Sequence, residues 1–125
     1  PGIGPVDRAT FQARCAAGLG ALDATQHVCN APLLRVEGDR AFARTYLVAQ
    51  HVANAAAPDG CLLIGAWYND ELQRSPEGWR ISARTGNPVW WSGNAAILGM
   101  AGLSQAFPRG EGHGAPAWLR PGNAD

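Results

Sequence analysis

The feature that most constrains this chain is a series of β-rich segments joined by very short turns. The turn sequences are Glu37-Gly38-Asp39, Pro58-Asp59-Gly60 and Ser75-Pro76-Glu77-Gly78. Each one reverses the chain within a few residues, because glycine tolerates positive φ and proline presets φ. The sequence therefore predicts four antiparallel strands with the following bounds: Thr25–Glu37, Arg40–Val52, Cys61–Arg74 and Trp79–Trp91.

One helix is predicted ahead of these strands. Apolar residues recur at a loose helical spacing between Asp7 and Leu22, and Pro5 lies where a helix start is expected. A helix followed by four antiparallel strands predicts an α+β fold, with the helix packed on one face of a curved sheet. We place this domain at residues 1–107. Residues 108–125 are rich in glycine and proline, and we expect a tail that is disordered or draped across a neighbour.

The charge balance excludes several kinds of partner. The chain has 10 Lys+Arg, all of them arginine, against 10 Asp+Glu, so its formal net charge is zero. We therefore expect no nucleic acid and no membrane as a partner, since both attract proteins with an excess of positive charge. No secretory signal is recognisable, which predicts a cytoplasmic protein. Charged residues make up only 16% of the chain, and the apolar surface this leaves favours a homo-oligomer, dimer or trimer.

The sequence offers no metal or cofactor motif. The three cysteines, Cys15, Cys29 and Cys61, have no metal-binding spacing, and we expect them to be small, buried, apolar side chains in a reducing compartment. A reactive thiol is the alternative. No glycine-rich phosphate loop follows a predicted strand, so we expect no organic cofactor.

Two histidines lie on the first two predicted strands. If these strands pair about Gly38, residues whose numbers sum to about 76 lie opposite each other, so His27 falls near Ala49 and His51 lies close by. His51 shares its strand face with small residues, Ala49 among them, which is typical of a cavity wall. Histidine is well suited to proton transfer near neutral pH, so the pair is a candidate catalytic site. The alternative is two structural histidines satisfied by hydrogen bonds.

Several short segments also occur in an order and spacing that is similar to a known family. They are Thr25-Gln26-His27, Glu37-Gly38-Asp39-Arg40-Ala41, Val48-Ala49-Gln50-His51, Gly65-Ala66-Trp67-Tyr68-Asn69-Asp70-Glu71-Leu72, Gly78-Trp79-Arg80-Ile81 with Arg84, and Trp90 with Gly93-Asn94. On these segments, residues 9–94 resemble the SnoaL-like, scytalone-dehydratase-like branch of the nuclear-transport-factor-2-like superfamily.

The resemblance implies a cone-shaped α+β barrel, in which a strongly curved sheet wraps around a pocket. Family enzymes are cofactor-free dehydratases, cyclases and isomerases, and related chains are non-catalytic oxygenase subunits. Two strand histidines of the dehydratases match His51 and His27, which implies catalytic roles for them. The resemblance further implies a small, apolar, oxygenated substrate, and it places Tyr68 and Arg84 at pocket positions. We expect Asp70 and Ala49 to contribute to substrate binding beside them.

One departure from the family bears on activity. Family members have N-terminal helices that supply an Asp to orient the histidine and Tyr residues to polarise the substrate oxygen, and this sequence has only eight residues before Ala9. A carboxylate near His51, from Asp70, a second copy or another segment, would restore an acid/base pair. Two hypotheses therefore stand: a dehydratase-like lyase or isomerase, and a non-catalytic ligand-binding or oligomeric subunit module.

Overall fold

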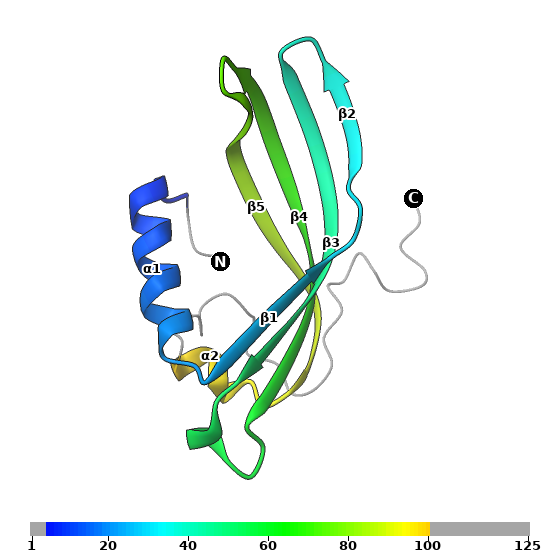
Figure 1. The fold of residues 1–125 in the computed structure, drawn as a ribbon. Helices are drawn as coiled ribbons and strands as arrows, with labels where there is room; N and C mark the ends of the chain where they lie inside the picture. The colour runs from blue at the N-terminus through cyan, green and yellow to red at the C-terminus, as the bar shows by residue number, and fades with distance from the viewer. Residues whose placement is uncertain (1–4, 101–125) are drawn as a thin grey trace.

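The structure, a computed structural model, describes residues 5–100 (Figure 1). The elements in chain order are α1 (Arg8–Gly20), β1 (Ala24–Cys29), β2 (Leu33–Glu37), β3 (Arg40–Val52), the 3-10 helix η1 (Asn54–Ala56), β4 (Cys61–Ser75), β5 (Gly78–Gly93) and α2 (Ala96–Met100). The predicted tail at 108–125 and the last residues of the predicted domain, 101–107, lie outside the described residues.

The five strands form one antiparallel sheet, which confirms the predicted α+β fold. Its order is β1-β3-β4-β5, and β2 pairs with β3 as well. Strand β3 has 13 residues, β4 has 15 and β5 has 16, so all three are much longer than a common strand of about 5–6 residues. Figure 1 shows these three strands bending along their length, with α1 and α2 on the same side of the sheet.

The first predicted strand is wrong as a single element, because it is two strands. β1 and β2 lie end to end along β3, with an interruption at residues 30–32. Pro32 has no backbone N–H, so the ladder cannot continue through it unbroken. Cys29 pairs with Leu47 and Leu33 pairs with Arg44, so the β1–β2 side carries one extra residue. The shift gives β1 the register predicted from a sum of 76.

The apolar core lies on the face of the sheet that we call the inner face. Residues directly opposite each other on paired strands share a face, so His51, Leu47 and Leu62 belong to one set of alternating side chains. These buried residues form the core with two side chains of α2: Leu47, Ala49, Ala53, Leu62, Ile64, Ala66, Ile97 and Leu98. Phe42, Arg44 and the residues that share their rows form the outer face.

Helix α1 lies over the inner face and buries little of itself. Its first turn is capped by Asp7, whose carboxylate accepts a hydrogen bond of 2.8 Å from the Thr10 N–H. Gly18 is its only buried residue, and Phe11 is more than half exposed. The helix predicted over Asp7–Leu22 is therefore confirmed as Arg8–Gly20, and most of its residues are exposed.

Candidate functional site

The two predicted histidines are neighbours on the inner face. His27 pairs with Ala49 and His51 pairs with Thr25, so the imidazoles lie diagonally across the β1–β3 ladder. Their ring centroids are 5.6 Å apart and the ring planes meet at 68°. This T-shaped contact places both rings at the same end of the sheet, as the register predicted.

The two rings differ in their access to solvent. His51 is only 3% exposed, whereas His27 is exposed. Among residues 5–100 the Nδ1 atom of His51 is the one buried side-chain nitrogen or oxygen without a hydrogen-bond partner. Leaving such an atom unpaired is costly, so the position suits a group that brings its own hydrogen bond.

Both histidines are biased towards the neutral form. His27 is exposed as a residue, but partial desolvation of its imidazole by neighbouring side chains lowers its pKa below the usual 6.5. Burial also lowers the pKa of His51, the nearby His27 adds to this effect, and a hydrogen bond with the Leu62 backbone opposes it. A neutral imidazole can accept a proton at neutral pH, so the pair has the protonation state that a general base requires.

Asp70 does not supply a carboxylate to His51. It lies opposite Ala43, eight residues along β3 from His51, and both of its oxygens accept hydrogen bonds from Arg84. No acidic side chain within residues 5–100 forms a hydrogen bond with His51. The acid that would orient His51 is therefore absent from the part of the chain that the structure describes.

The other predicted polar residues form a second cluster further along the inner face. The Arg84 Nε and Nη2 atoms each donate a 2.7 Å hydrogen bond to Asp70, and the Arg84 guanidinium carbon lies 4.0 Å from the centre of the Tyr68 ring. Burial raises the pKa of Tyr68 above its usual 10.0, with Arg84 acting in the opposite direction, so the phenol is a hydrogen-bond donor at neutral pH. The bond to Asp70 raises the pKa of Arg84.

The predicted site residues thus fall into two groups. Ala49 is buried in the row of His27, whereas Tyr68 pairs with Thr45. Four residues of β3 separate these rows, which is about 13 Å along the strand at about 3.3 Å per residue. The inner face therefore carries a histidine pair at one end, Tyr68, Arg84 and Asp70 towards the other, and an apolar floor between them.

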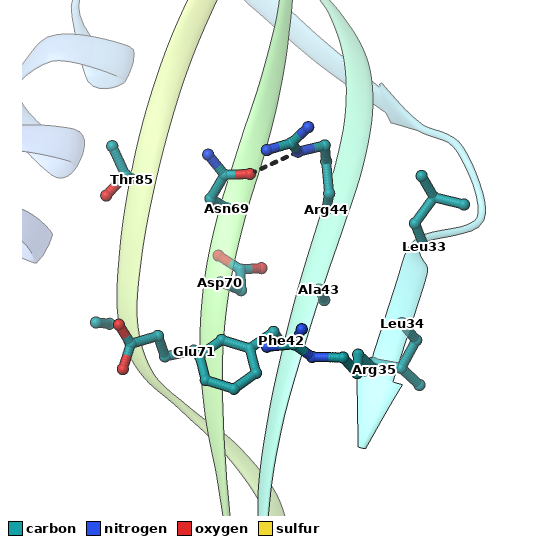
Figure 2. A pocket seen from close by; sticks show the side chains of 11 residues that line it. Leu33, Leu34, Arg35, Phe42, Ala43, Arg44, Asn69, Asp70, Glu71 and Thr85 are labelled. Carbon is teal, nitrogen blue, oxygen red and sulfur yellow. Dashed lines mark hydrogen bonds between the residues drawn. The ribbon is translucent and has the colours of Figure 1, made fainter. Parts of the chain in front are cut away.

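A hollow that the sequence analysis did not predict lies on the outer face (Figure 2). Its volume is about 530 Å³, within the range of small-molecule sites. Two cross-strand rows form most of it: Arg35, Phe42, Glu71 and Ala83, then Leu33, Arg44, Asn69 and Thr85. Arg44 donates a hydrogen bond of 2.9 Å from Nε to the Asn69 amide oxygen, drawn as a dashed line in Figure 2. The sequence pattern that could have indicated this hollow is the alternation of side chains along β3, which places Phe42 and Arg44 on the face of the sheet opposite the histidines.

Comparison with known proteins identifies the family. Residues 2–85 match the SnoaL-like domain. The chain belongs to the SnoaL-like domain family. Its α+β sheet also matches solved structures of the nuclear-transport-factor-2-like fold, so the resemblance inferred from the sequence is confirmed. No curated protein matches the chain significantly.

Three solved structures illustrate how this SnoaL-like domain compares. The Kfla4162 protein from Kribbella flavida aligns with a TM-score of 0.63 and 27% identity, over 78% of this chain and 64% of the other. A candidate aromatic ring hydroxylase from Novosphingobium aromaticivorans aligns with a TM-score of 0.64 and 23% identity, over 80% of this chain and 69% of the other. A protein of unknown function from Mycobacterium tuberculosis aligns with a TM-score of 0.58 and 19% identity, over 78% of this chain and 63% of the other. At these identities the second and third similarities concern the fold alone.

The chain spans 64% of the Kribbella protein and 63% of the Mycobacterium protein. Within residues 5–100, no helix is both long enough and apolar enough to cross a membrane. In the same range, no three His, Cys, Asp or Glu side chains gather in a group that could hold a metal ion.

Proposed function

We propose that this SnoaL-like domain is the sheet part of a cofactor-free lyase or isomerase for small, apolar, oxygenated substrates, with His51 and His27 as its proton-transfer groups. The observation that carries the proposal is the histidine contact itself. Two imidazoles lie 5.6 Å apart, one of them is buried, and its Nδ1 atom has no partner among the described residues. Burial lowers the pKa of both, which favours neutral bases.

The proposed dehydration takes place next to a carbonyl group. A neutral histidine accepts a proton from the carbon beside the carbonyl, and the electrons of that C–H bond form the new double bond. The C–O bond at the next carbon then breaks, and the departing hydroxide takes a proton from the histidinium to leave as water. For an isomerase, the same proton returns to a different carbon. His51 is the proposed base and acid, and the exposed His27 relays protons between it and the substrate or solvent.

The proposal requires an acidic group to orient His51. Both oxygens of Asp70 accept hydrogen bonds from Arg84, so the acidic group that orients His51 has to come from a second copy or from residues outside 5–100. The partial coverage of the Kribbella protein, 64%, is compatible with such a contribution. Without an orienting acid we expect a slow reaction, because the tautomer of His51 is not set.

The test compares variants on a panel of small β-hydroxy ketones, with absorbance of the conjugated product as the readout. We expect His51→Gln to lower turnover by about 100-fold or more, which is typical for the loss of a general base. Gln50→Ala is the control, because Gln50 is adjacent in sequence but points to the outer face. Equal turnover by the wild type and His51→Gln on every converted substrate would falsify the proposal.

The second candidate is a non-catalytic binding or subunit module. Exposed apolar side chains on β1 and β2 favour it, above all Leu33 at 76% and Leu34 at 59% exposed. Both border the outer-face hollow, Leu33 on the outer face and Leu34 opposite Ala43 on the inner face, so a second copy or another subunit that covered this edge of the sheet would bury them. Covalent conversion of any bound compound, detected by mass spectrometry, would exclude a purely non-catalytic role.

A further inference from the structure

The guanidinium of Arg84 is held in a way that leaves one of its edges free. Its Nε and Nη2 atoms donate to the two oxygens of Asp70, so the side edge of the planar group is occupied. The end edge, formed by Nη1 and the second N–H of Nη2, has no partner among residues 5–100. Two parallel N–H groups on such an edge match the two oxygens of a carboxylate.

Neighbouring groups fix the orientation of this edge. The Asp70 side chain is only 6% exposed, whereas 38% of the Arg84 side chain remains exposed. The Tyr68 ring covers one face of the guanidinium at 4.0 Å. The Tyr68 phenol, whose ring lies against the guanidinium, stays protonated at neutral pH because burial raises its pKa, so its hydroxyl can act as a donor. A buried acid and an aromatic ring therefore present an oriented fork at a partly open surface.

We propose that Arg84 and Tyr68 bind a carboxylate group of the substrate, with Asp70 as the residue that positions Arg84. Asp70 already neutralises Arg84, so the selectivity comes from the geometry of the fork and not from an excess of positive charge. The same neutralisation disfavours a doubly charged phosphate, whose second charge would face Asp70 unpaired. This inference rests on the proposed function and names its substrate class: an apolar carboxylic acid.

The position of the fork also sets the shape of that acid. The row of Tyr68 lies four residues from the row of His27, about 13 Å along the strand at about 3.3 Å per residue. Leu47 and Ala66 lie between these rows and are only 3% and 8% exposed, because they belong to the packed apolar core. A substrate whose carboxylate is held by Arg84 and whose reacting carbon lies at the histidines is therefore elongated, and its apolar body passes over this packed core rather than through it.

The experiment measures binding of a matched pair of probes, 6-phenylhexanoate and its uncharged amide, by isothermal titration calorimetry. We expect the wild-type chain to bind the carboxylate about tenfold more tightly than the amide, as expected for charge-assisted hydrogen bonds. Arg84→Met should abolish this preference. Arg80→Met is the matched control, because Arg80 is an exposed arginine that pairs with Glu77 and does not line the outer-face hollow, and it should leave the preference intact.

Two further variants keep the proposal testable if Arg84→Met fails to fold. Arg84→Lys keeps a cation beside the buried Asp70 but has no pair of parallel N–H groups, so the preference should fall several-fold. Tyr68→Phe removes a single hydroxyl, and it should lower the affinity for the carboxylate probe more than the affinity for the amide probe. An equal affinity for both probes, no binding of the carboxylate, or loss of the preference in Arg80→Met overturns the inference.

Failure of this inference is distinguishable from failure of the proposed function. If turnover depends on His51 but shows no preference for carboxylates, the carboxylate site is refuted and the proposed lyase or isomerase activity is retained. A carboxylate preference that depends on Arg84, in a chain whose turnover is unaffected by His51→Gln, supports the site and removes the catalytic role.

Discussion

Replacement of Gly65 by alanine tests how tightly the outer face is packed. Gly65 is buried in β4 and pairs with Trp90 of β5. A Cβ atom at this position would overlap the indole ring of Trp90, a rigid group held between strands. The Trp90 Nε1–H also donates a hydrogen bond of 3.2 Å to the Tyr46 hydroxyl, so a displaced indole loses a cross-strand contact as well.

The expected cost follows from these two effects. Forcing a methyl group into a packed site costs about 1–3 kcal/mol. Loss of the exposed Trp90–Tyr46 hydrogen bond adds up to about 1 kcal/mol. We therefore expect Gly65→Ala to lower the free energy of unfolding by about 1–4 kcal/mol, a large part of the roughly 5–15 kcal/mol typical of a domain.

The assay is equilibrium unfolding in urea, followed by tryptophan fluorescence and circular dichroism. Gly20→Ala is the control, because a Cβ there meets nothing within 4 Å. It should be neutral or stabilise by at most about 1 kcal/mol, since alanine is the better helix former. If Gly65→Ala loses less than about 0.5 kcal/mol, or both variants lose the same amount, the packing argument is refuted.

Three further predictions concern titration, assembly and thiol access. Burial lowers the pKa of His51 in the folded state below 6.5, so the unfolded state binds more protons than the folded state as the pH falls below 6.5. The free energy of unfolding is therefore greatest above pH 6.5, and it decreases on acidification from 6.5 through the lower folded-state pKa. Urea unfolding at several pH values should show this loss, His51→Gln should reduce it, and a wild-type stability that rises on acidification would contradict it. Leu33→Asp places a charge on a side chain that is 76% exposed, so it should lower the assembly state seen by light scattering without unfolding the monomer; an unchanged oligomer would show that Leu33 lies outside the interface. Cys29 is exposed, and Cys15 and Cys61 are half-buried, so the prediction that all three cysteines are buried is wrong. The Cys29 thiol should therefore react fastest with an aromatic disulfide reagent, and Cys29→Ser should remove that phase.

The long strands were predictable because their signals are local. Turn residues and alternation placed β3 at Arg40–Val52 without error, and β4 and β5 differ from their predicted bounds by one or two residues. The division between β1 and β2 was missed, although Pro32 marks it, because β-rich composition on both sides concealed the interruption. The predicted pairing of His27 with Ala49 held because β1 restores the register after that extra residue.

The partition of the candidate site could not be predicted from spacing. His51 and Asp70 lie on the same face, and only the register of β3 with β4 shows that they are eight residues apart along the sheet. Asp70 meets Arg84 because these residues are direct cross-strand partners in β4 and β5. The role of Asp70 as a partner for Arg84 therefore depends on the sheet register, which a single sequence specifies only indirectly.

The sequence by itself determined the α+β class, the turns, the helix and the neighbouring positions of the two histidines, because these follow from periodicity and from hairpin geometry over short distances. Only the tertiary structure decided which side chains are buried together. Among residues 5–100, the His51 Nδ1 atom has no hydrogen-bond partner, Asp70 accepts hydrogen bonds from Arg84, and Leu33 is exposed beside the outer-face hollow. The physical reason is that burial and hydrogen-bond partners depend on contacts between distant strands and helices, which local sequence patterns do not specify.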